Sequence, residues 1–218
     1  MKKIFLMLFI TVLLSSCSSR YDESMKNAKE AMLQKQYEEA INQLEVALIE
    51  KPTDKFAKAL MENAKEKLLE QELNDSINEF LITTNEIYKQ VIKFGEAFDV
   101  DIISVGTATD ALPKVIELKN SVESLHDSWA NNDKFSTTYN NLFSAINSLK
   151  SSYESIAENI VDENLDNANE GESRSERLKK LRNSNDSRTR AMFSFHEYEL
   201  YIESYKRDII KLEKMLVK

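Results

Sequence analysis

The residue types that carry most enzyme and metal chemistry are scarce in this sequence. The chain of 218 residues has two histidines and one cysteine. His126 and His196 stand 70 residues apart, and Cys17 lies far from both, whereas a zinc site needs ligands clustered at short spacings. Each histidine is therefore interpreted as a surface or bundle-edge residue, and the sequence predicts no bound metal and no cofactor.

Carboxylates are numerous, but their spacing does not predict a reaction. Asp99-x-Asp101 begins like a calcium loop, yet the same register puts Ile103 at a ligand position and Ser104 where the turn glycine belongs. The three glycines are scattered singly, which excludes a glycine-rich phosphate loop. The sequence also has neither a Gly-x-Ser-x-Gly elbow nor a His-Glu-x-x-His motif. We therefore expect a protein that is not an enzyme.

Cys17 follows a segment that has the layout of an export signal. Lys2 and Lys3 precede an apolar run at residues 4–14, and small residues follow the run, which is the order found in a signal peptide. The run has about half of the roughly 20 apolar residues that a membrane-spanning helix needs. The tetrapeptide at residues 14–17, Leu-Ser-Ser-Cys, resembles the lipobox of bacterial lipoproteins.

The lipobox resemblance implies cleavage before Cys17 and a diacylglyceryl thioether on its sulfur. Residues 1–16 are then a removed signal peptide, and residues 17–20 form a short lipidated tether. Two acyl chains are enough for stable anchoring, so the protein is expected on the extracytoplasmic face of a cell membrane, close to the bilayer. The alternative is an ordinary secretory signal with a chance cysteine nearby.

Composition predicts an all-α fold without nucleic-acid binding. Only three glycines and two prolines interrupt a chain that is 42% hydrophobic, so long stretches have no helix breaker. The net charge of −8 becomes −10 when residues 1–16 are removed, because they carry two lysines and no acid. Such an acidic body argues against nucleic acid, whose phosphates need clustered Lys and Arg.

Residues 21–54 resemble one tetratricopeptide repeat. With Pro52 at the proline of the repeat, the signature positions hold Ala28, Tyr37, Ala40, Leu44 and Ala47. The small alanines let two antiparallel helices approach closely, while the two large side chains fill the gap between them. The helix-A half is weaker, because Ser24 and Asn27 stand where a large aromatic residue and a leucine are usual. The alternative is a generic helical hairpin.

The segment after the repeat is expected to cover its open side. Glu62 stands where a second repeat needs a small residue, so residues 54–72 are interpreted as a capping helix with the stripe Ala57, Leu60, Ala64 and Leu68. The repeat resemblance implies partner binding through helix A, where Met25, Lys29 and Met32 are the candidate exposed contacts. The alternative is that the protein's own helices cover this face.

Residues 73–218 are expected to form an elongated bundle of long helices, on which the hairpin and capping helix at 21–72 pack. Ser76-x-x-Glu79 has the form of a capping box and predicts a helix start. Another helix is expected near Thr107-x-x-Asp110, with Pro113 in its first turn.

The strongest periodicity predicts a coiled-coil-like seam. Its apolar residues step alternately by four and three, at Phe135, Tyr139, Leu142, Ile146, Leu149, Tyr153, Ile156 and Ile160. A last stripe runs through Phe195, Tyr198, Ile202, Tyr205, Ile209 and Leu212. The stretch 182–190 lacks apolar seam residues, so a break or a frayed segment is expected there.

Two blocks of opposite charge lie between these stripes. Residues 154–172 hold seven acids and no base, and residues 174–190 hold seven bases and two acids. The favoured interpretation is a helical hairpin whose facing halves carry complementary charge. The alternative is a basic strip laid on anionic lipid or an anionic wall polymer, formed by Arg174, Arg177, Lys179, Lys180 and Arg182.

The leading functional hypothesis is a membrane-anchored adaptor or scaffold that binds an envelope protein or peptide. It depends on the lipobox and on the repeat resemblance. The alternative is a helical bundle that binds an apolar or amphipathic small ligand between its helices. A third possibility is a helical spacer or inhibitor without a groove.

Overall fold

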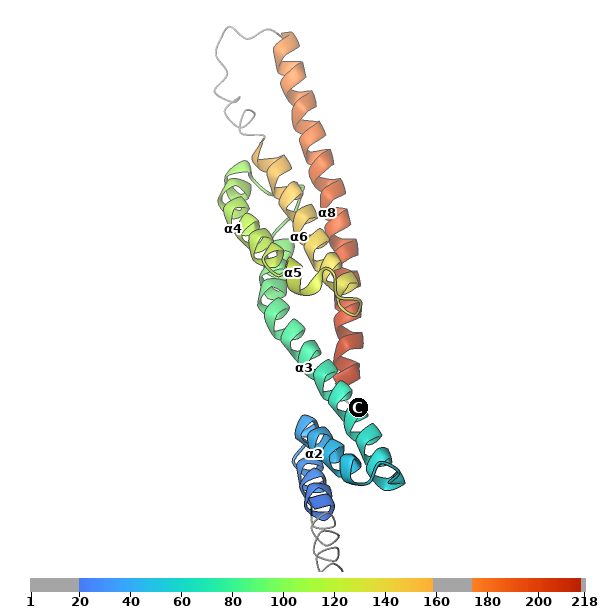
Figure 1. The fold of residues 1–218 in the computed structure, drawn as a ribbon. Coiled ribbons are helices and arrows are strands. Elements are labelled where there is room, and N and C mark those ends of the chain that lie inside the picture. Colours follow the sequence, from blue (N-terminus) through green and yellow to red (C-terminus); the bar gives the residue numbers. More distant parts are fainter. Residues whose placement is uncertain (1–19, 159–173, 217–218) are drawn as a thin grey trace, which may run out of the picture. The chain divides into compact units, whose positions relative to one another are not determined.

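The computed structural model describes residues 20–158 and 174–216, with the side chains of residues 174–185 outside the description. All regular elements in these ranges are helices, and no strand occurs there (Figure 1). The predicted all-α helical-bundle class is confirmed. The chain divides into two compact units, which we call unit 1 (through Ser76) and unit 2 (from Ile77).

Unit 1 contains a helix described over residues 20–33, helix α2 (Tyr37–Glu50) and the first part of helix α3 (Lys55–Glu96). The first turn between helices is tight because its chain reverses in a Schellman motif. Gln36 N–H donates to the carbonyl of Ala31 at 2.9 Å, and Lys35 N–H donates to the carbonyl of Met32 at 3.2 Å. Lys35 takes the left-handed conformation that this motif requires, with φ 58°.

The core of unit 1 consists mainly of alanine. Its fully or nearly buried members come from all three helices: Met25, Ala28, Ala31, Ala40, Leu44, Ala47, Ala57 and Ala64. Side chains this small let the helix axes approach closely. The expected stripe of the 54–72 segment packs here, since Ala57 and Ala64 are fully buried and Leu60 lies against the same cluster.

Helix α3 continues without a break through the expected start at Ser76, so that prediction is wrong. The Ser76 hydroxyl donates to the Glu72 carbonyl at 2.8 Å, a bond between successive turns of one helix. No glycine or proline occurs between Lys55 and Phe94. A capping box marks a helix start only where the preceding chain stops being helical.

Unit 2 contains the rest of α3 together with α4 (Val105–Glu123), α5 (His126–Trp129), α6 (Ser136–Ala157) and α8 (Arg174–Leu216). Helix α6 packs against α4 on one side and α8 on the other (Figure 1). The predicted seam of α6 is confirmed from Phe135 to Ile156, where all seven large residues are at most 1% exposed. Its last member, Ile160, lies outside the described residues.

Tyrosine hydroxyls of α6 and α8 donate hydrogen bonds to α3, two of them to its backbone and one to a threonine side chain. Tyr153 donates to the Phe94 carbonyl at 2.8 Å, and Tyr198 donates to the Val91 carbonyl at 3.5 Å. Tyr205 donates to Thr84 Oγ1 at 2.8 Å. Because buried polar groups need partners, these bonds fix where α3 lies against both helices within unit 2.

Helices α4 and α8 differ from the sequence prediction. Helix α4 begins at Val105, where Ser104 Oγ accepts the Thr107 N–H at 3.0 Å, and Pro113 therefore lies two turns inside the helix rather than in its first turn. The helix ends at Glu123, and Trp129 lies in the separate short helix α5.

Helix α8 is continuous through residues 182–190, where a break was expected. The seam continues there with small residues, because Ser187 is 4% exposed and Ala191 is fully buried. No glycine or proline interrupts the helix.

Candidate functional site

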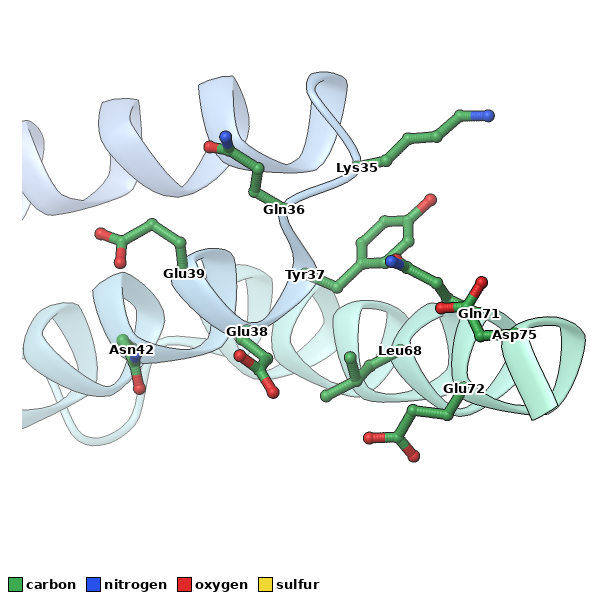
Figure 2. Close-up of a pocket in the computed structure, with 10 residues that line it drawn as sticks. All are labelled: Lys35, Gln36, Tyr37, Glu38, Glu39, Asn42, Leu68, Gln71, Glu72 and Asp75. Atoms are coloured by element: carbon green, nitrogen blue, oxygen red, sulfur yellow. The ribbon is translucent and has the colours of Figure 1, made fainter. Parts of the chain in front are cut away.

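A hollow described in unit 1 has a volume of about 680 Å³ and lies between the start of α2 and the fourth to sixth turns of α3 (Figure 2). We call it the polar hollow. Its lining is mostly charged or amide side chains: Lys35, Gln36, Tyr37, Glu38, Glu39, Asn42, Leu68, Gln71, Glu72 and Asp75. All ten residues precede Ile77, so the site belongs to unit 1 alone.

The helices of unit 1 create the hollow by their different lengths. Helix α2 begins at Tyr37, whereas α3 runs on through Gln71 and Asp75, so the α2 side chains leave this part of α3 uncovered. Figure 2 shows Tyr37 reaching from the start of α2 toward Gln71 and Asp75, with Leu68 beside it. The site thus has an apolar floor of two side chains and a polar rim.

The rim carries excess negative charge. Four of the lining residues are acids and one, Lys35, is a base. Among the described residues, Glu38, Glu72 and Asp75 have no ion-pair partner, while Glu39 accepts a hydrogen bond from Gln43 at 2.8 Å. A hollow of this kind offers carboxylate acceptors to an amine or a guanidinium group.

The opposite end of the hairpin is closed by polar contacts. The Asp54 carboxylate accepts the Ala57 N–H at 2.8 Å and the Tyr21 hydroxyl at 2.9 Å, and these two bonds lower the pKa of Asp54. Lys51 Nζ lies 3.6 Å from the centre of the Tyr21 ring. This end is therefore tied to α3, which leaves the polar hollow as the open end.

The expected partner contacts on the first helix lie in three different environments. Met25 is 5% exposed and belongs to the alanine-rich core, so the expectation that it is an exposed contact is wrong. It shares this buried cluster with Ala40 of α2 and Ala64 of α3. Met32 is partly buried against the same core, and Lys29 is exposed with its Nζ 5.1 Å from the Phe56 ring.

The other predicted site residues lie outside the part of the chain whose side chains are described. Cys17, the expected lipid attachment site, lies outside the described residues. The predicted basic strip lies on the first turns of α8, whose side chains are also outside them: Arg174, Arg177, Lys179, Lys180 and Arg182.

Sequence reasoning missed the polar hollow. Its carboxylates occur at helical spacing, which usually indicates a solvated face. The available signal was the length of α3. An uninterrupted helix after the hairpin extends past the start of α2, so part of its surface has no α2 residue beside it.

Aromatic rings pack against one another in the described interior of unit 2. Phe80 packs edge-on against Trp129, with 5.3 Å between the ring centroids, and stacks on Phe135 at a centroid distance of 5.0 Å. Phe98 stacks on Phe195 at a centroid distance of 4.8 Å and packs edge-on against Tyr153 at 5.0 Å. The two hollows described in unit 2 have volumes of about 300 and 280 Å³ and lie between α3 and α8.

Within the described residues, no helix combines the length and apolar character needed to span a membrane. The same residues contain no group of three or more His, Cys, Asp or Glu placed to hold a metal ion. Comparison of the chain with protein-family models, with curated proteins and with solved structures gives no match.

Proposed function

We propose that this protein is a lipid-anchored adaptor of the bacterial cell envelope and that its polar hollow binds a basic segment of another envelope protein. The observation that carries the proposal is the hollow itself. It is about 680 Å³ in volume, and three of its carboxylates have no ion-pair partner among the described residues. A lysine or arginine side chain of a partner would supply the missing charge.

The geometry of unit 1 supports presentation of this site to a partner outside the bilayer. The described part of the first helix begins at residue 20, three residues after the proposed lipid attachment at Cys17. It runs for 14 residues, or about 21 Å, before the turn at Lys35 that borders the hollow. In the proposed arrangement, the anchor and the binding site are at opposite ends of this helix.

Site-specific photocrosslinking in intact cells tests the binding site. A photoreactive residue at position 71, in the hollow, should give an adduct with one partner, whereas the same residue at position 45, on the outer face of α2, should not. The double charge reversal Glu38→Lys/Glu72→Lys should abolish the adduct, because it repels a basic segment.

The matched control is Glu45→Lys/Glu66→Lys, which makes the same charge change on the same two helices at exposed positions away from the hollow. It should keep the adduct. Equal adducts from both double variants, or from both crosslinker positions, would refute the polar hollow as the binding site.

The anchor has a separate test. In Cys17→Ala, we expect loss of metabolic palmitate labelling and release of the chain from the membrane fraction. A variant that stays membrane-bound and unlabelled would refute lipid anchoring through Cys17 without affecting the proposal for the hollow.

A further inference from the structure

A second surface of the molecule, in unit 2, has the features of a helix-binding groove. The two hollows between α3 and α8 follow one another along the same helix pair, since one includes Tyr88 and Tyr205 and the other Gly95 and Tyr198. We call them together the α3–α8 groove. Between Leu81 and Glu96, the α3 side of this groove extends for about 22 Å, which is the length of roughly four turns of helix.

The floor of the α3–α8 groove is apolar. Its aliphatic and aromatic lining consists of Leu81, Ile82, Tyr88, Ile92, Phe195, Tyr198, Ile202, Tyr205 and Ile209. Ile82 is 76% exposed at the edge of this lining, so it offers apolar surface to a partner. Gly95 lets the Tyr198 ring pack directly against α3, because a Cβ at this position would overlap the Tyr198 hydroxyl.

The rim of the groove is acidic. Glu96, Glu199, Glu203 and Glu213 line it, and Lys206 is the one cation among the lining residues. Lys206 is already held by Glu203 at 2.7 Å. Glu96 and Glu213 have no ion-pair partner among the described residues.

We infer that the α3–α8 groove binds an amphipathic helix of a partner protein that has an apolar stripe flanked by lysine or arginine. The apolar floor would take the stripe, as in helix-in-groove recognition, and the acidic rim selects the charge of the flanks. This site goes beyond the proposed function, since it lies in unit 2 and does not include any residue of the polar hollow.

The experiment uses the intact protein and two synthetic helical peptides of about 18 residues, which span about 27 Å. Both carry the same leucine stripe. One has lysine and the other has glutamate at every flanking position. Calorimetric titration should show that the lysine peptide binds at least about tenfold more tightly, with the difference shrinking at high salt.

The groove variant is Ile82→Lys/Glu213→Lys, which changes one exposed and one rim residue without touching the buried core. It should weaken binding of the lysine peptide about tenfold or more. The matched control, Ile102→Lys/Glu117→Lys, changes an exposed isoleucine and an exposed glutamate of unit 2 outside the groove. It should alter binding less than about twofold.

Several results would overturn the inference. They are equal binding of the two peptides, equal loss in the groove variant and its control, or a concentration-dependent dimer that only the groove variant loses. Binding to zwitterionic vesicles that the groove variant alone loses would assign the groove to lipid instead. The polar-hollow variant Glu38→Lys/Glu72→Lys should bind the lysine peptide as the unmodified protein does. A failure of the groove inference can therefore be distinguished from a failure of the proposal for the polar hollow.

Discussion

Unit 1 and unit 2 bury side chains of different kinds. Six of the eight core residues of unit 1 are alanines. In unit 2, the largest fully buried side chains include Tyr139, Tyr153, Tyr205, Phe80 and Phe135. An alanine core gains stability from the close approach of its helices and buries little apolar area per residue. An aromatic side chain, in contrast, buries about 150–250 Å².

The two candidate sites are therefore supported by cores of different composition. Unit 1 presents the polar hollow on a small, tightly spaced hairpin whose core has little apolar area to lose. Unit 2 presents the α3–α8 groove on helices fixed by rings and by tyrosine hydroxyl bonds. We expect unit 1 to be the less stable of the two and unit 2 to be the more sensitive to alkaline pH.

Alkaline pH should give the largest effect, and it should act on unit 2. Burial raises the pKa of Tyr153 to about 12 and raises the pKa of Tyr198 and Tyr205 as well. In the unfolded chain these hydroxyls ionise near pH 10. Their stabilising contribution is therefore complete below about pH 10 and is lost as the pH rises, by about 1.4 kcal/mol per pH unit for each tyrosine.

Chemical denaturation followed by Trp129 fluorescence across alkaline pH measures this slope, because Trp129 is the single tryptophan and lies in unit 2. Tyr205→Phe should make the slope shallower, since it removes one of the titrating hydroxyls. Tyr201→Phe changes a 39% exposed ring on the same helix and is the matched control. Identical slopes in all three proteins would contradict the role assigned to the buried hydroxyl.

Truncation of a ring in unit 2 should give the next largest effect. Phe80→Ala removes the contacts with Trp129 and Phe135 and should lower the free energy of unfolding by about 3–5 kcal/mol. Phe56→Ala truncates a 57% exposed ring in unit 1 and should lower it by less than about 1 kcal/mol. If the two losses are similar, the ring cluster is not the main support of unit 2.

Enlargement of a buried alanine tests the core of unit 1. Ala40 is fully buried, so Ala40→Leu should force the helices apart and lower the free energy of unfolding by about 1–3 kcal/mol. Amide hydrogen exchange should show the loss of protection in residues 21–54 rather than in α6. Ala59→Leu adds the same atoms at an exposed position of α3 and should change the free energy of unfolding little. If it lowers the free energy of unfolding as much as Ala40→Leu does, Ala40 is not needed for the close approach of the helices.

Large apolar residues at regular spacing made much of this fold predictable from the sequence. The α6 seam from Tyr139 to Ile156 was predictable because only one helical face can bury all of its members. Small buried residues carried no comparable signal, so the seam through Ser187 and Ala191 was missed and a break was expected in α8.

Local motifs were less reliable than helix continuity. Ser76-x-x-Glu79 matches a capping box, but the helix before it has no breaker and continues. The candidate sites were harder to predict, because the polar hollow depends on where α2 begins relative to α3, and the α3–α8 groove depends on how two helices far apart in the sequence pair. Met25 shows the same limit: its place on helix A suggested an exposed contact, but it belongs to a buried cluster shared with α2 and α3.

The smallest predicted effect concerns Lys35 and has the opposite sign. A non-glycine residue at φ 58° lowers the free energy of unfolding by about 1–2 kcal/mol, because the left-handed region is strained for it. Glycine removes this strain but lowers the free energy of unfolding by about 0.4–1 kcal/mol, because it gives the unfolded chain more freedom. Lys35→Gly should therefore stabilise unit 1 by about 0.5–1 kcal/mol, measured by hydrogen exchange of residues 21–54. The substitution also removes the one cation of the polar hollow, so the position-71 adduct with a basic partner should persist or increase. A stabilised variant that loses the adduct would mean that the Lys35 side chain itself contacts the partner, and the polar hollow would then recognise more than positive charge.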